Sequence, residues 1–190
     1  MHLLAGLGNP GEKYAGNRHN VGFMAIDAIA AHHKFPAFRS KFNGLISEKE
    51  IAGEKVLLLK PQTFMNESGQ SVAAAASFYK LGPEAVTVFY DELDLIPGKV
   101  RVKRGGGNGG HNGLRSIDPR LGLDYRRVRI GIGHPGHKDR VTPHVLGNYA
   151  KSEYEPLADL LSAMAAEAPW LAEGDDTRFM NEVARRLHQD

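Results

Sequence analysis

The sequence contains no cysteine, and this absence excludes several kinds of chemistry at once. A chain without thiols forms no disulfide, offers no thiolate nucleophile and provides no sulfur ligand for zinc. No apolar run approaches the length of a membrane-spanning helix. The N-terminus also lacks the basic segment and the long apolar stretch of a secretory signal peptide. We therefore expect a cytoplasmic protein.

The net charge is small, but the charges are unevenly distributed along the chain. All 190 residues together carry a formal charge of +2. Residues 99–140 contain 11 Lys and Arg but only 3 Asp and Glu, a local charge of +8, and the remainder carries −6. Such a basic segment is typical of proteins that bind a polyanion such as nucleic acid, although a solvated basic surface has the same composition.

The hydrophobic pattern predicts strands and helices in alternation. Strands are expected at HLLAGLG, AVTVFY, KVRVKR and YRRVRIGIG, and a hairpin from GLISEKEI and KVLLLKP. Helices are expected from residue 21, over about 67–79, as a short helix after the glycine run, along 157–171 and along 178–187. Asn20 is a candidate N-cap for the first helix, and Asp175 or Asp176 for the last.

This order predicts an α/β fold with a single three-layer domain over residues 1–190, in which a mixed central β-sheet carries helices on both faces. The C-terminal helices, at about 152–187, would form a covering layer or a lid.

Five polar clusters follow predicted strands or turns. They are Asn9, residues 17–20, residues 64–66, residues 91–94 and residues 111–113. Because ligands of open α/β sheets bind beyond the carboxyl ends of the strands, we expect these loops to converge. The resulting site would contain one histidine of interest, His19, one carboxylate, Asp91, and several side-chain amides.

A histidine held by an aspartate, with no G-x-S-x-G motif and no cysteine nearby, is equipped to activate water as a general base. Side-chain amides supply donors for a developing oxyanion and acceptors for the substrate. The set predicts hydrolysis of an activated carbonyl compound such as an ester. Some of these residues also have a simpler explanation. Asn9 precedes a Pro-Gly turn, where asparagine is common. Phe64 and Met65 could belong to the core or, beside Asn66, form an apolar wall on which a base or sugar rests.

Two sets of residues imitate metal sites. His134 and His137, with His144, lack a carboxylate to complete them, and the pair Asp91 and Asp94 has no further ligands. We expect no metal.

The glycine run at residues 105–110 satisfies the spacing G-x-G-x-x-G of a dinucleotide-binding turn, and Asp124 lies near the acidic position of that motif. Residues 112–113, 118–119 and 122 would interrupt the long helix that such a site requires. We therefore expect no cofactor, and glycines that let a loop pass close to a bulky substrate. Lys103 and Arg104 would stand at the entrance of this loop.

Five blocks lie in order between Met1 and about Tyr149: GLGNPGEKYAGNRHNVGF (6–23), KPQTFMNESG (60–69), YDELDLIPG (90–98), GGGNGGHNGLRSI (105–117) and RVRIGIGHPG (127–136). Together they resemble the bacterial-type peptidyl-tRNA hydrolase family. The resemblance implies an enzyme that cleaves the ester between a peptide and the 3′-terminal ribose of tRNA. It further implies a monomer that needs no metal or cofactor and recycles tRNA from prematurely released peptidyl-tRNA.

The resemblance also implies catalytic roles. His19 would be the general base, and Asp91 would stabilise and orient it. Asn9 would help to distinguish N-blocked peptidyl esters from free aminoacyl esters. Asn66 and Asn112 would hold the peptide backbone and the attacking water or the oxyanion.

The implied tRNA contacts fall into two groups. The binding site for the tRNA 3′ end would include Tyr14 and Phe64, with Met65 beside them. The 5′-phosphate at the acceptor stem would contact Lys103 and Arg129, with Lys138 as a weaker candidate. Asn108 and Tyr90 stand where some relatives have histidine, and we assign them no chemistry.

A non-catalytic RNA-binding module is the main alternative. Basic residues and glycine loops suffice for such a module, because phosphate contacts do not depend on sequence. It would leave Asn9, His19 and Asp91 without a role.

Overall fold

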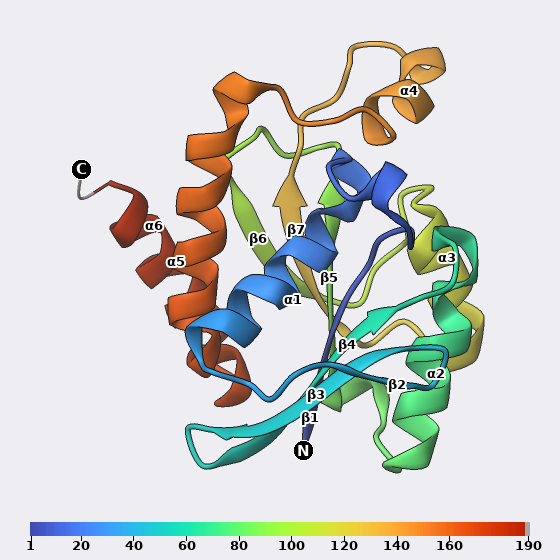
Figure 1. Ribbon diagram of the computed structural model, residues 1–190, viewed down its shortest axis with the longest axis vertical. Coiled ribbons are helices and arrows are strands. Elements are labelled where there is room, and N and C mark those ends of the chain that lie inside the picture. Colours follow the sequence, from blue (N-terminus) through green and yellow to red (C-terminus); the bar gives the residue numbers. More distant parts are fainter. Residues whose placement is uncertain (189–190) are drawn as a thin grey trace.

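Seven strands form one mixed sheet at the centre of the computed structural model, which describes residues 1–188 (Figure 1). The strands are β1 (His2–Gly6), β2 (Arg39–Lys41), β3 (Gly44–Ile51), β4 (Glu54–Pro61), β5 (Val86–Glu92), β6 (Val100–Arg104) and β7 (Arg126–Gly131). They lie in the order β2-β3-β4-β1-β5-β7-β6. Strands β4, β1, β5 and β7 are parallel, and β2, β3 and β6 pair antiparallel to their neighbours.

Helices cover both faces of this sheet, which confirms the expected α/β fold class (Figure 1). One face carries α1 (Val21–His32), α5 (Tyr154–Ala172) and α6 (Asp176–Leu187), and the other carries α2 (Ser68–Phe78) and α3 (Asn112–Leu121). The short helix α4 (Val141–Val145) lies beyond the carboxyl end of β7 (Figure 1). In the part of the chain that the structure describes, none of the helices combines the length and the hydrophobicity that a membrane span needs.

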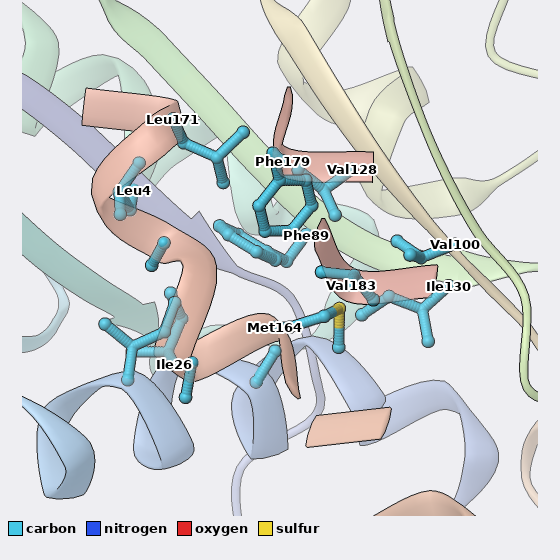
Figure 2. Close-up of a cluster of buried hydrophobic side chains, with 14 of the residues drawn as sticks. Leu4, Ile26, Phe89, Val100, Val128, Ile130, Met164, Leu171, Phe179 and Val183 are labelled. Carbon is cyan, nitrogen blue, oxygen red and sulfur yellow. The ribbon is translucent and has the colours of Figure 1, made fainter. Parts of the chain in front are cut away.

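The two C-terminal helices belong to the core of the domain. Phe89 and Val128 of the central strands pack with Leu171 of α5 and with Phe179 and Val183 of α6, all fully buried (Figure 2). Because burial of a large apolar side chain contributes about 1.5–3 kcal/mol, these contacts hold both helices firmly against the sheet.

The helix caps follow the expectation at one end of the chain and depart from it at the other. The Asp175 carboxylate accepts a hydrogen bond from Arg178 N at 3.0 Å and caps α6. Asn20 occupies the cap position of α1, but its side chain makes no capping bond there. Its amide is engaged in a different contact, described below.

The glycine run does not form a dinucleotide-binding turn. It connects β6, through α3, to β7, and these strands are antiparallel, whereas the dinucleotide motif joins parallel strands. Four of its glycines have positive φ: Gly105, Gly106, Gly109 and Gly110. The buried guanidinium of Arg127 donates to the carbonyls of Gly106 and Gly107, both at 2.7 Å, and thereby fixes the loop.

One strand and one α-helix of the described residues were not predicted. Strand β2 has only three residues, polar and largely exposed, and exists through its pairing with β3. Helix α4 is a five-residue turn without a buried side chain.

Candidate active site

His19 and Asp91 meet at the carboxyl edge of the sheet. His19 lies in the 3₁₀ turn Arg18–Asn20, between β1 and α1, and Asp91 lies near the end of β5, the neighbour of β1. Nδ1 of His19 is 2.7 Å from Oδ2 of Asp91. Only 9% of the histidine side chain and 1% of the aspartate side chain are exposed. The two loops that carry His19 and Asp91 therefore meet at this edge.

A second histidine shares the same carboxylate. Nε2 of His111 is 2.7 Å from the other oxygen of Asp91, and the two imidazole centroids are 5.1 Å apart. Gly113 N donates to Nδ1 of His111 at 3.1 Å, so Nδ1 carries the lone pair and Nε2 carries the proton. The expectation of a single histidine in the site was therefore wrong. His111 is the N-cap residue of α3, and this position directs its ring toward the end of β5. Because the contact joins distant parts of the chain, the sequence contains no local signal for it.

The protonation of the cluster follows from the charge of Asp91. Burial alone would raise the pKa of this carboxyl, but His111 and His19, which face it and bond to it, hold the pKa well below its ordinary value. An ionised carboxylate only accepts hydrogen bonds, so the imidazole nitrogens that face it both carry protons. His19 is then protonated at Nδ1 and presents the lone pair of Nε2 to the pocket.

Asn9 is locked in place by two neighbouring segments. Its backbone N–H donates to the Asn20 side-chain oxygen, and the Asn20 amide donates back to the Asn9 carbonyl, both at 2.9 Å. Met65 N donates to Oδ1 of Asn9 at 2.7 Å. With its oxygen occupied, the Asn9 side chain retains an amide NH₂ that has no partner within residues 1–188. The Met65 side chain lies in the hydrophobic core, not on an exposed apolar wall.

A pocket of 430 Å³ lies over the His19–Asp91 pair. Its lining includes His111, Asn112 and Lys138, together with residues of α4. Tyr90 also lines it and packs its ring edge-on against His111, with centroids 5.1 Å apart. Burial raises the pKa of the Tyr90 phenol, so it is neutral here. Asn108 completes a turn, in which its Oδ1 accepts from Gly110 N at 2.9 Å.

Other predicted site residues lie outside this pocket. Tyr14 and Phe64 pack edge to face with centroids 6.4 Å apart, and Phe64 is 60% exposed. Asn66 is exposed in the 3₁₀ turn Met65–Glu67, directly before α2. Phe64 and Asn66 form an exposed surface after β4, and the half-buried ring of Tyr14, from the 3₁₀ turn Glu12–Tyr14 after β1, packs against it.

The basic segment divides into surface and buried residues. Strand register places Lys103 and Arg129 on the same face of β6 and β7, and Arg129 faces Glu92 at 3.9 Å. Arg104 points to the opposite face, toward Asp176 of α6, and so does not stand beside Lys103 at the loop entrance. Arg126 and Arg127 are buried, so the local charge of +8 overstates the basic surface.

The histidines considered for a metal do not come together. The rings of His134 and His137 accept hydrogen bonds from Gly136 N and Asp139 N in their own turns, and His144 contacts a carbonyl oxygen. Within the described residues, the cluster whose ligand atoms lie close enough for an ion is His19, Asp91 and His111. Metal binding there would require both imidazoles to release the protons that they share with Asp91, so the hydrogen-bonded arrangement suits a base better than a ligand set.

A mixed α/β sheet with a buried histidine–carboxylate pair and adjacent amides at its carboxyl edge has the equipment of a hydrolase that activates water. A family model described as peptidyl-tRNA hydrolase matches residues 3–190. The chain belongs to the peptidyl-tRNA hydrolase family.

Named relatives agree over almost the whole chain. A peptidyl-tRNA hydrolase from Sphingopyxis alaskensis is 66% identical over 187 residues, 98% of this chain and 99% of its own. One from Erythrobacter litoralis is 64% identical with the same coverage. The crystal structure of peptidyl-tRNA hydrolase from Acinetobacter baumannii is 42% identical and superposes with a TM-score of 0.91, covering 96% of this chain and 94% of that one.

Proposed function

We propose that this chain hydrolyses the ester bond that joins the peptide to the 3′-terminal ribose of peptidyl-tRNA, with water activated by His19. The observation that carries the proposal is the 2.7 Å contact between His19 Nδ1 and the buried Asp91 carboxylate, which leaves Nε2 as the base. Family membership supports the choice of substrate.

The reaction needs one proton acceptor in the pocket. Nε2 of His19 takes a proton from water as the water oxygen attacks the ester carbonyl carbon. The tetrahedral intermediate then expels the ribose oxygen, which regains a proton from the imidazolium, and the products are a peptide acid and tRNA with a free ribose hydroxyl. Asp91 stabilises the imidazolium that forms on the way. General-base catalysis of this kind contributes about 10²- to 10⁴-fold in rate.

Neutral amides assist the charge that develops on the carbonyl oxygen. The NH₂ group of Asn9 is a donor whose position is fixed by the contact between Met65 N and Oδ1. Asn112, at the start of α3, and Asn66, after β4, would bind the peptide main chain and the water or oxyanion. Met65 would thus act through its backbone N–H rather than through its side chain.

The RNA would be held by aromatic and basic side chains. The exposed ring of Phe64, with the half-buried ring of Tyr14 packed against it, provides a surface for the tRNA 3′ end. Lys103, Arg129 and Lys138 would bind the 5′-phosphate and acceptor stem. The contact of Arg129 with Glu92 is long, at 3.9 Å, so a phosphate can compete for the guanidinium. We further propose that the protein acts as a monomer, without metal or cofactor, in the cytoplasm, where translation releases its substrate.

The test compares the intact chain with His19→Ala on an N-acetylaminoacyl-tRNA, measuring the released acid and the integrity of the tRNA. The substitution should slow hydrolysis by about 10²- to 10⁴-fold and leave tRNA binding unchanged. His32→Ala, at the exposed end of α1, is the matched control. Near-normal turnover of His19→Ala would contradict the mechanism. Salt-sensitive RNA binding without hydrolysis by the unaltered chain would instead favour a binding module.

A further inference from the structure

A polar groove of 570 Å³ lies near the sheet edge that is opposite to Lys103. It forms where the β2–β3 turn, the end of β4 and the start of α2 meet. Its polar lining comprises Ser40, Lys41, Asn43, Gln62, Thr63 and Gln70. The mechanism described above uses none of these side chains.

The turn at one wall of the groove is strained. Phe42 and Asn43 both have left-handed backbones, with φ of 57° and 53°, in a two-residue turn of the kind that usually contains Asn-Gly. The Phe42 ring packs against Phe78 and Tyr79, with centroids 5.3 and 5.9 Å away, and so offsets the strain. Gln62 N donates to the Asn43 carbonyl at 2.8 Å. These contacts fix the turn at the groove, and strain that is maintained in this way is common at functional sites.

The amide side chains of the groove are available to a ligand. Within residues 1–188, the side chains of Asn43 and Gln70 have no hydrogen-bond partner. The Gln62 amide reaches only the carbonyls of Lys60 and Pro61, both at 3.4 Å. Each amide offers a donor and an acceptor, the same pair that a peptide main chain presents. Such a surface matches the main chain of an extended peptide and makes no demand on its side chains.

The charge of the groove suits a peptide better than a nucleic acid. Lys41 is its one cationic lining residue, and the ammonium lies 4.1 Å from the centroid of the Phe78 ring. Grooves that follow a phosphate backbone carry several cations.

The strand order places this groove on the peptide side of the reaction. Figure 1 shows the order of the strands from β6 to β2. Along this order, Lys103 lies on β6, Arg129 on β7, Asp91 on β5, the turn with His19 after β1, and Asn66 after β4, followed by the groove. The basic residues proposed for the 5′-phosphate and acceptor stem therefore lie on the opposite side of the histidine–aspartate pair from the groove, whereas Phe64, proposed for the tRNA 3′ end, directly follows Thr63 of the groove lining. Because the ester joins the tRNA 3′ end to the peptide, a peptide that leads away from the acceptor stem runs past Asn66 toward the groove.

We propose that the groove is a subsite for the main chain of the peptide beyond its first residues, an inference that rests on the proposed function. Gln70 follows Asn66 by four residues, which is about 6 Å along a helix. That distance equals about two residues of extended peptide. The groove thus binds the peptide from about the third residue counted from the ester, and a single acylated amino acid does not reach it.

The experiment measures kcat/KM for two substrates that share the same tRNA. The short substrate carries a single N-acetylated amino acid, and the long substrate carries a pentapeptide. Gln70→Ala should lower the value for the pentapeptide about three- to tenfold, and Gln62→Ala/Gln70→Ala should lower it further. Both variants should retain the value for the short substrate. Gln70→Trp, which fills the groove, should act on the long substrate alone. Ser77→Ala, exposed at the far end of α2, is the control.

Two results would overturn the subsite. One is an unchanged ratio of kcat/KM for the long substrate to kcat/KM for the short substrate in the double variant, provided that this variant unfolds at the same temperature as the unaltered chain. The other is an equal loss on both substrates, which would indicate an RNA contact or a structural role. Neither result would affect the proposed function, because the unaltered chain must still cleave the short substrate, and its failure to do so would count against the hydrolase itself.

Discussion

Replacement of His111 tests whether the second histidine of the site contributes to catalysis. Its Nε2 donates one of the two imidazole hydrogen bonds to the Asp91 carboxylate, which is 1% exposed. A hydrogen bond to a charged group contributes about 1.5–3 kcal/mol. If that energy serves to orient and stabilise the His19 imidazolium through Asp91, then His111→Ala should lower kcat by ~10- to 150-fold with little change in KM.

The same substitution should shift the pH dependence in a defined direction. His111 is one of the two groups that hold the pKa of Asp91 low, so its loss raises that pKa. As the pH is lowered, the variant should therefore lose activity at a higher pH than the unaltered chain does. His111→Gln, which retains a donor, should recover part of kcat.

The assay is single-turnover hydrolysis of N-acetylaminoacyl-tRNA between pH 4 and 9, with urea unfolding of each variant alongside. A loss of stability alone does not show a catalytic role, because the His111 ring also accepts a hydrogen bond from Gly113 N and caps α3. Removal of a helix cap destabilises a protein by about 1 kcal/mol. If folded His111→Ala has an unchanged kcat and an unchanged acid side of its pH–rate profile, His111 has no role in catalysis and serves only the structure.

Three further results are expected. The depressed pKa of Asp91 contributes stability above the pKa of an unfolded aspartate, about 3.9, that is lost as the pH falls through the lower folded value. The free energy of unfolding, measured in urea, should therefore decrease less steeply from pH 6 to 3 in Asp91→Asn than in the unaltered chain. Asp176→Asn should destabilise the fold by about 2–3 kcal/mol in urea, because buried Arg126 loses an ion pair at 2.8 Å. Lys103→Ala should weaken tRNA binding and reduce the salt slope by about 1, as filter binding at several salt concentrations would show.

The elements that the sequence predicts are those with a strong local pattern. The apolar run that ends at Asp91 and the long helix that contains Leu171 are both recovered, because burial imposes a period that can be read along the chain. Strand β2 has no such pattern and depends on its partner β3.

The candidate site could be predicted only in part. His19 and Asp91 were identified through polar residues after strands and through family resemblance, and the topology brings them together. The second contact of Asp91, to His111, depends on where α3 begins relative to β5, and this is a property of the assembled sheet. The burial of Arg126 could not be predicted from the sequence either, because its partner Asp176 lies 50 residues away on α6.

The most direct test of the account is the tautomer of His19, because the mechanism requires a proton at Nδ1 and a lone pair at Nε2. Nitrogen-15 NMR of the imidazole rings, assigned with His111→Gln and His19→Ala, would measure it at neutral pH. We expect a protonated Nδ1 bonded to Asp91 and an unprotonated Nε2. A His19 ring that is protonated at Nε2 and bare at Nδ1 would contradict it.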